Sequence, residues 1–251
     1  MIKVLVHGSN GKMGTHVLEC IAKNSELELF CGVDPKTTGC ENYKYYDSFD
    51  KVEGKADVII DFSFHTLVKG VLDYAVKTET PVLIATTALD DEDKKAVAKA
   101  SQKVPVFLAA NMSVGVALLA DFAKQAAKMF PDADIEIVES HHNRKVDAPS
   151  GTAIMLANAV NQEFDDNKIY EYDRHSKRQK RSKNEIGIHS VRGGTIVGEH
   201  DVIFAGHDEV ITVSHAAYSR EVFAVGAVRA AKFLHNKEPG LYDMNSIMNF
   251  G

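Results

Sequence analysis

The sequence predicts an α/β protein, in which an N-terminal Rossmann-type, doubly wound parallel sheet is followed by a smaller α+β domain with a mixed sheet. Three observations predict this fold class. Strand and helix patterns alternate through the first hundred residues, an order typical of a parallel sheet with helices on both faces. A glycine-rich segment follows the first strand pattern. Beyond residue 111 several short strand patterns follow one another closely, which favours a second, separate sheet.

The elements of the first domain are predicted from apolar runs bounded by turn residues. Strands are expected over 2–6, 27–33, 57–62, 81–86 and 104–109, and helices over 14–24, 66–78 and 88–103. The short run 57–62 suits a strand that is buried on both faces of a parallel sheet. Four acidic residues, 90–93, open the third helix, where negative charge is favoured by the helix dipole.

The second domain is expected to begin near residue 111. Helices are expected over 114–129 and 152–163, and strands over 134–140, 187–192, 195–197, 201–205 and 209–215. The last four of these strands predict a mostly antiparallel or mixed sheet. A final helix over 220–234 is expected to pack back on the first domain. The predicted division is therefore 1–110 together with 218–251 for the first domain, and 111–217 for the second.

Composition narrows the classes of protein. The net charge of −6 gives no support for a nucleic-acid-binding protein. No apolar run approaches the roughly 20 residues that span a membrane, and the first run ends at His7, too early for a signal peptide. Cys20, Cys31 and Cys40 are odd in number and lack CxxC spacing, so free thiols in a reducing cytoplasm are expected.

A basic stretch runs from Arg174 to Lys183. Because the chain is acidic overall and the stretch lacks interleaved aromatic residues, a mobile, solvated loop is favoured over a nucleic-acid site. Such a loop could still attract an anionic ligand.

The glycine-rich segment predicts a pyrophosphate site. Gly8, Gly11 and Gly14 join the first strand to the first helix, where glycines allow a close approach and helix N–H groups face an anion. The motif by itself is weak evidence, and its position between a strand and a helix strengthens it. The candidate residues for binding the cofactor here are Gly8, Ser9, Asn10, Gly11, Lys12 and Met13.

Asp34 ends the second predicted strand, twenty residues after Gly14. An acidic residue at this place can bind the ribose hydroxyls of NAD. Lys36 could instead approach the 2′-phosphate of NADP, and Asp34 could simply cap a turn. These residues leave NADH and NADPH both open as the cofactor.

Two further segments lie at predicted strand ends, where ligands of open parallel sheets bind. Their small residues and hydroxyl groups suit contact with the nicotinamide ribose. The candidate residues are Ala85, Thr86 and Thr87 in the first segment, and Ala109, Ala110, Asn111 and Met112 in the second.

Residues 139–153 carry the strongest chemical signal. His141, His142 and Lys145 are proton donors that can also be cations, and they precede a helix that starts at Ser150, Gly151 and Thr152. Hydroxyls and N–H groups at a helix start can bind an anion. The cluster therefore predicts a carboxylated substrate that is protonated as it is reduced. Adjacent histidines do not readily share one ion, and no zinc ligand set accompanies them, so no metal site is expected.

Each of these residues also has a structural alternative. Ser150 could be only a helix N-cap, and Lys145 only a solvated loop charge. Four later histidines are expected to be structural or interface residues: His189, His200, His207 and His215. Arg220 and Phe223, at the start of the last helix, are weaker candidates for contact with the cofactor.

These motifs together resemble the dihydrodipicolinate reductase family. The matching segments are Gly8 to Gly14, Thr86-Thr87, Asn111 to Gly115, the HHNRKVDAPSGTA stretch from His141, and Arg192 to His200. The resemblance implies hydride transfer from NADH or NADPH to a small ring dicarboxylate in lysine and diaminopimelate synthesis. It implies that His141 donates the proton, that Lys145 is catalytic, that His142 holds the substrate, and that Gly151 and Thr152 bind a carboxylate. It also implies a homotetramer built through the sheet of the second domain.

The sequence leaves two other functions open. Another two-domain dehydrogenase would share the glycine turn but would not need the histidine and lysine cluster. A non-catalytic dinucleotide sensor would bind NAD(P)H without turning over a substrate.

Overall fold

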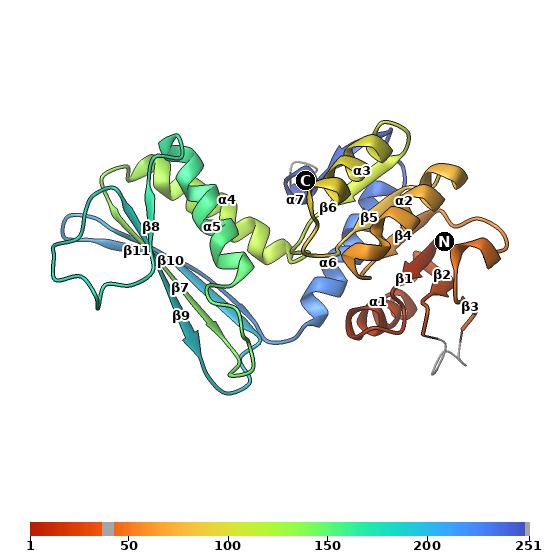
Figure 1. Ribbon diagram of the computed structural model, residues 1–251, viewed down its shortest axis with the longest axis horizontal. Coiled ribbons are helices and arrows are strands. Elements are labelled where there is room, and N and C mark those ends of the chain that lie inside the picture. Colours follow the sequence, from red (N-terminus) through yellow and green to blue (C-terminus); the bar gives the residue numbers. More distant parts are fainter. Residues whose placement is uncertain (37–42, 249–251) are drawn as a thin grey trace. The chain divides into compact units, whose positions relative to one another are not determined.

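The computed structural model describes residues 1–36 and 43–248, so Cys40 lies outside the described residues. The chain divides into two compact units (Figure 1). Unit 1 comprises Met1–Val114 and Arg220–Gly251, and unit 2 comprises Gly115–Ser219. Each unit is described by itself below.

Unit 1 contains a seven-stranded sheet in the order β12-β6-β5-β4-β1-β2-β3. All of its strand pairs are parallel, as the fold class predicts. Strand order reverses between β1 and β4, and the crevice at such a reversal is where open α/β sheets bind ligands. The strands are β1 (Ile2–His7), β2 (Leu27–Val33), β3 (Tyr45–Tyr46), β4 (Val58–Asp61), β5 (Val82–Ile84), β6 (Pro105–Leu108) and β12 (Gly240–Tyr242).

Helices cover both faces of this sheet (Figure 1). Helices α1 and α6 contact each other, and helices α2 and α3 contact each other. Asp90 and Asp93 form a capping box at the start of α3, as the acidic run there suggested. The elements are α1 (Lys12–Ala22), the short helix η1 (Phe49–Lys51), α2 (His65–Thr78), α3 (Asp91–Ser101), α6 (Glu221–Leu234) and α7 (Met244–Met248).

The close packing of α6 depends on small residues. A side chain at Gly226 would place its Cβ only 1.7 Å from the carbonyl oxygen of Met112. The buried face of α6 continues with alanines, including Ala224, Ala227 and Ala231, which let the helix backbone approach its neighbours. The central strands beneath are fully buried and rich in Val, Ile and Leu, the composition of a parallel sheet covered on both faces.

Unit 2 contains a five-stranded mixed sheet in the order β11-β10-β7-β9-β8. Strands β7, β9 and β8 are parallel, whereas β10 is antiparallel to both β7 and β11. This arrangement confirms the predicted mixed sheet. The elements are α4 (Val114–Met129), β7 (Asp134–His141), α5 (Gly151–Asn161), the short helix η2 (Gln162–Phe164), β8 (Ile169–Glu171), β9 (Glu185–Arg192), β10 (Gly198–Ala205) and β11 (Val210–Ala217).

The core of unit 2 lies between this sheet and helices α4 and α5. Ile135 and Ile137 alternate with more exposed residues along β7, so one face of the strand is buried under the helices. The other face of the sheet, called the open face below, is the more exposed of the two. On β11 the residues of that face, Val210, Thr212, Ser214 and Ala216, are all exposed.

The structure corrects the predicted elements at one segment, and it adds three short strands, the short helix η1 and helix α7. Residues 195–197 form no strand, because Gly194 and Thr195 lie in the turn that joins β9 to β10. Three strands therefore follow one another there, not four. Short strands at 45–46, 169–171 and 240–242 were not predicted, since two or three residues carry no readable periodicity. No described helix is long and apolar enough to cross a membrane.

The prediction of a mobile, solvated loop for the basic stretch is wrong for two of its arginines. Arg174 forms ion pairs of 2.9 Å with both Glu136 and Glu185. Arg181 pairs with Asp134 and Glu136, also at 2.9 Å, and donates to two strand carbonyls. These contacts fix the segment to the strands β7 and β9. The sequence could not show the contacts with Glu136, because this residue lies about forty residues before the two arginines.

Candidate active site

The glycine turn of unit 1 has the geometry that a phosphate site requires. Gly8 has a φ of +76°, and a Cβ there would lie 2.7 Å from the carbonyl oxygen of Phe62. A Cβ at Gly14 would lie 2.1 Å from the carbonyl oxygen of Gly8. Helix α1 begins at Lys12 with Gly11 as its N-cap and no side-chain cap. Its first N–H groups therefore have no acceptor within the helix and can face an anion.

Asp34 is tied to this turn by its carboxylate. One oxygen accepts a hydrogen bond from the backbone N–H of Asn10 at 3.0 Å, and the other from the N–H of Lys36 at 2.9 Å. The side-chain amide of Asn10 in turn donates to the carbonyl of Lys36. The structure thus brings together the predicted turn and the predicted ribose-binding residue. Lys12 is exposed and Met13 partly exposed at the start of α1.

Ser9 lies in the turn but faces inward. It is 1% exposed, and a Cβ on Gly32 would lie 2.5 Å from its hydroxyl oxygen. The expectation that Ser9 contacts a pyrophosphate therefore can only apply to its backbone.

A buried polar group underlies the carboxyl ends of β1 and β4. His7 Nδ1 lies 2.7 Å from Asp61 Oδ1, and Thr86 donates its hydroxyl to the other oxygen of Asp61 at 2.6 Å. Sequence reasoning missed His7 and Asp61, although an aspartate inside an apolar strand was a visible signal. The Thr86 hydroxyl proton is used in this group.

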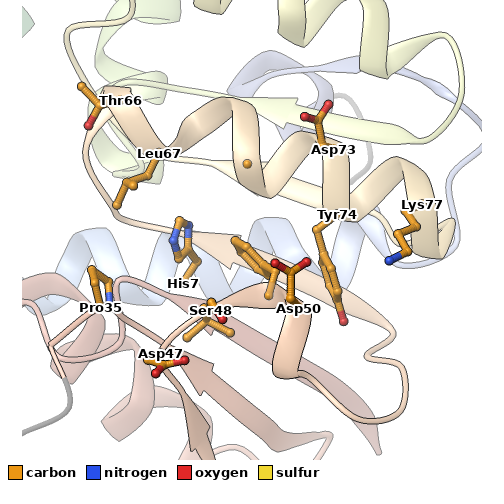
Figure 2. Close-up of a pocket in the computed structure, with 13 residues that line it drawn as sticks. His7, Pro35, Asp47, Ser48, Asp50, Thr66, Leu67, Asp73, Tyr74 and Lys77 are labelled. Atoms are coloured by element: carbon orange, nitrogen blue, oxygen red, sulfur yellow. The ribbon is translucent and has the colours of Figure 1, made fainter.

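A cavity of about 470 Å³ opens beside His7 in unit 1. Figure 2 shows the His7 ring below Leu67 of α2, with Pro35 and Asp47 on the strand side. The inner wall of the cavity is aromatic. The centroid of the Phe49 ring lies 4.8 Å from that of the His7 ring and 4.7 Å from that of the Tyr74 ring, on which Phe49 stacks. The further lining residues are Val33, Ser48, Asp50, Thr66, Gly70, Asp73 and Lys77.

The other predicted cofactor residues of unit 1 lie at the ends of β5 and β6. Ala85 and Thr86 are buried, and Thr87 is exposed. In the second segment Ala109 and Asn111 are partly exposed, Ala110 is exposed, and the side chain of Met112 is buried. Arg220 and Phe223 stand at the start of α6.

In unit 2 the end of β7 carries a histidine–carboxylate pair. His141 Nδ1 lies 2.6 Å from Glu139 Oε2. Arg192 on β9 binds the same carboxylate through two nitrogens, at 2.8 and 2.7 Å. Burial acts to raise the pKa of Glu139, but hydrogen bonds from Arg192, Ser190, His141 and the Ser150 backbone bring it down to about 2. Glu139 is therefore a carboxylate at any working pH.

His200, which was expected to be a structural or interface residue, belongs to the same group of contacts. Its Nε2 lies 3.1 Å from the hydroxyl of Ser150, and its ring meets the His141 ring edge-on at 5.3 Å between centroids. Burial and the neighbouring His141 lower the pKa of His200 to about 4, so this ring stays neutral. Its contact with Ser150, fifty residues earlier, could not be predicted from the sequence.

Ser150 itself is used within the protein. Its hydroxyl caps α5 by accepting from the Ala153 N–H, and its own N–H donates to Glu139 at 3.1 Å. The N–H of Ser150 is therefore already bonded to the Glu139 carboxylate. Gly151 is exposed at the start of α5, and Thr152 is partly exposed.

Lys145 and His142 lie in the loop between β7 and α5. The Lys145 ammonium pairs with Asp147 at 2.8 Å, and its side chain is 20% exposed. His142 is partly exposed, and its carbonyl accepts from the Lys145 N–H. The loop therefore holds the lysine ammonium against Asp147 rather than in open solvent.

One group of the described residues has ligand atoms close enough for a metal ion. These atoms belong to His65, Asp90 and Asp93 and lie within 4.8 Å of one another in unit 1. The two aspartates are the pair that forms the capping box of α3.

The fold and these two groups of residues define a class of protein, the two-domain nicotinamide-dependent oxidoreductases. Family models for the N-terminus and the C-terminus of dihydrodipicolinate reductase match residues 2–112 and 115–248. The chain belongs to the dihydrodipicolinate reductase family. This finding confirms the resemblance seen in the sequence.

Individual relatives agree over the whole chain. The 4-hydroxy-tetrahydrodipicolinate reductase of Caldanaerobacter subterraneus subsp. tengcongensis is 51% identical over 251 residues, which is 100% of both chains. That of Clostridium tetani is 39% identical over 99% of this chain and 98% of its own. A solved dihydrodipicolinate reductase from Paenisporosarcina sp. TG-14, with dipicolinate bound, is 26% identical, with a TM-score of 0.83 over 98% of this chain and 99% of that one.

The family assignment defines the activity. The chain is an NAD(P)H-dependent oxidoreductase that reduces 4-hydroxy-tetrahydrodipicolinate, a step of lysine and diaminopimelate biosynthesis. Another two-domain dehydrogenase and a non-catalytic sensor, which the sequence left open, are not supported.

Proposed function

We propose that His141 is the proton donor of this reaction and that Lys145, His142, Gly151 and Thr152 bind the substrate. The observation that carries the proposal is the pair of His141 with the buried carboxylate of Glu139, close to the start of α5. The dipicolinate in the Paenisporosarcina enzyme is a ring with two carboxylates, which suits a helix start and a lysine.

In this mechanism the hydroxyl of the substrate leaves as water, which gives an unsaturated ring. His141 would donate a proton to one ring carbon, while the bound nicotinamide would supply a hydride to the neighbouring carbon. The hydride and the proton together add two electrons and two protons, and the nicotinamide is oxidised. The Lys145 ammonium and the N–H groups at the start of α5 offset the carboxylate charge of the substrate. NADH or NADPH supplies only the hydride, and the proton comes from the protein.

The test is the decay of nicotinamide absorbance with substrate made freshly from aspartate semialdehyde and pyruvate. We expect rapid oxidation by the purified protein. Oxidation that persists unchanged in His141→Ala would refute the proposed proton donor without touching the family assignment.

We propose further that the dinucleotide is bound by unit 1, with its pyrophosphate on Gly8, Asn10, Gly11 and the start of α1. The adenosine then extends past Asp34 to the cavity beside His7, whose aromatic wall suits a planar base. The small residues at the ends of β5 and β6 are left to contact the nicotinamide half.

NADH is the preferred cofactor in this proposal. The carboxylate of Asp34 is fixed by two backbone N–H groups. It can accept hydrogen bonds from the ribose hydroxyls of NADH, but its negative charge would repel the 2′-phosphate of NADPH. Asp47 and Asp50 add negative charge to the same cavity. We expect kcat/KM for NADH to exceed that for NADPH by about tenfold or more.

Replacing Asp34 by asparagine is expected to lower the NADH-to-NADPH ratio of kcat/KM by about tenfold, because the repelling charge is lost. The measurement compares both cofactors at fixed salt. Asp57→Asn is the matched control, since Asp57 also accepts a backbone N–H, from Lys3, at the opposite end of the sheet. An unchanged ratio in the Asp34 variant would refute this role.

We propose that the chain forms a homotetramer through the open face of the sheet of unit 2. Exposed valines on this face, including Val191 at 46% and Val210 at 63%, favour burial against another copy. Sedimentation should show a species of four chains that Val210→Lys shifts to smaller ones. A monomer at micromolar concentration would contradict the proposal.

We place this activity in the cytoplasm, where reduced nicotinamides are available. Cys20 and Cys31 are buried free thiols, and burial raises the pKa of Cys31 to about 12, so this thiol resists oxidation.

A further inference from the structure

The buried carboxylate of Glu139 has a second role beside binding Arg192. We infer that Glu139 is a positioning residue that holds His141 with its proton on Nδ1, so that Nε2 is the atom that gives the proton to the substrate. The inference rests on the proposed role of His141 as the proton donor.

The carboxylate of Glu139 is fully buried, and each of its oxygens has at least two donors. Oε1 accepts from Arg192 at 2.7 Å and from the Ser150 N–H at 3.1 Å. Oε2 accepts from Arg192 at 2.8 Å and lies 2.6 Å from His141 Nδ1. An ionised carboxylate can only accept hydrogen bonds, so His141 Nδ1 must be the donor in this contact.

This contact selects one of the two neutral forms of the ring. In the neutral ring the hydrogen is on Nδ1, where the carboxylate engages it, and Nε2 is unprotonated. When the ring is protonated, Nε2 therefore carries the proton that can be given to the substrate. The bidentate contact of Arg192, together with the Ser150 N–H, prevents the carboxylate from turning away. The tautomer of His141 is therefore set by groups on β7, β9 and the start of α5.

Two neighbours fix the plane of the ring. A Cβ at Gly198 would lie 3.1 Å from His141 Nε2, so the glycine leaves the space that this atom occupies. His200 meets the ring edge-on from another side and is held by Ser150. Because His200 is neutral, it adds no second positive charge beside the proton donor. The side chain of His141 keeps 12% exposure, which leaves it in reach of a ligand.

A wild-type measurement tests the inference without any variant. Nitrogen NMR spectra of ¹⁵N-histidine-labelled protein, with His141 assigned from its loss in His141→Ala, report the tautomer above the titration of the ring. We expect a protonated Nδ1 and an unprotonated Nε2. A neutral ring with its proton on Nε2 would overturn the inference.

The kinetic test is Glu139→Gln. A glutamine can donate its amide N–H to Nδ1, so that the neutral ring carries its proton on Nε2. The substitution also removes the negative charge that stabilises the imidazolium form of His141. We expect kcat to fall by about 10²-fold or more, a large share of what a positioned general acid supplies. KM for the substrate and Kd for NADH should stay within about threefold, because neither is held by Glu139.

Glu136→Gln is the matched control. Glu136 lies on the same strand, and its carboxylate oxygens lie 2.7 Å from His189 Nε2 and 2.9 Å from Arg181 Nε. The three residues form a carboxylate–histidine–arginine group of the same kind, outside the proposed site. We expect its kcat to match the wild type.

The outcomes separate the two claims. Wild-type turnover in His141→Ala would refute the proposed proton donor. A large loss in His141→Ala combined with wild-type turnover in Glu139→Gln would overturn only the positioning role. If Glu139→Gln fails to fold, the tautomer measured in the wild type decides.

Discussion

Replacing His141 by alanine is expected to lower kcat by about 10²–10⁴-fold, the usual contribution of a positioned general acid. The side chain belongs to unit 2, whereas the glycine turn and Asp34 belong to unit 1. The Kd for NADH, measured by fluorescence titration, should therefore stay within about twofold of the wild type. The pair of measurements distinguishes loss of proton transfer from loss of cofactor binding.

His189→Ala is the control for this variant. His189 also pairs with a strand glutamate, at 2.7 Å, but Glu136 is its partner and the pair lies outside the proposed site. Its kcat is expected to match the wild type. Equal losses of turnover and of NADH affinity in His141→Ala would contradict the assignment of His141 as proton donor.

Gly14→Ala is expected to disrupt the glycine turn. The new Cβ would lie 2.1 Å from the Gly8 carbonyl oxygen, and this neighbour is backbone that cannot turn away. Either α1 must move away from the turn or the turn must open. We expect a loss of about 3 kcal/mol in the free energy of unfolding, or ~6–12 °C in Tm, together with weakened NADH binding.

Gly70→Ala is the matched control for stability. Gly70 lies within α2, and an added Cβ there meets nothing within 4 Å. Because alanine favours the helix more than glycine does, this variant should gain about 0.5–1 kcal/mol. A Gly14→Ala protein as stable as the wild type would show that the turn tolerates the side chain.

The fold was predictable where patterns are long and local. The strand at Leu27–Val33 and the helix at Val114–Met129 have the bounds that were predicted, because their apolar periodicity spans several turns or pleats. The segment 195–197 was mistaken for a strand because Thr, Ile and Val suit strands, while the preceding Gly193-Gly194 places it in a turn. Strand β12 has too few residues for any pattern and exists through its pairing with β6.

The candidate site was predictable only in its contiguous part. His141, Lys145 and Gly151 stand in one stretch of sequence and could be selected together. Glu139 was inside that stretch but received no role, since its importance comes from Arg192 on another strand. His200 and the His7–Asp61 pair likewise depend on contacts between residues about fifty positions apart.

The division of unit 1 between two stretches of the chain bears on the order in which the protein can fold during synthesis. Unit 2 is one continuous stretch, and all of it is synthesised before α6 and β12. Unit 1 cannot complete its sheet until β12 joins β6, nor cover α1 until α6 is present. The N-terminal stretch therefore belongs to the unit that is completed last. Until β12 has been made, the outer edge of β6 has no strand beside it, and newly made chains can pair wrongly with one another at such an edge.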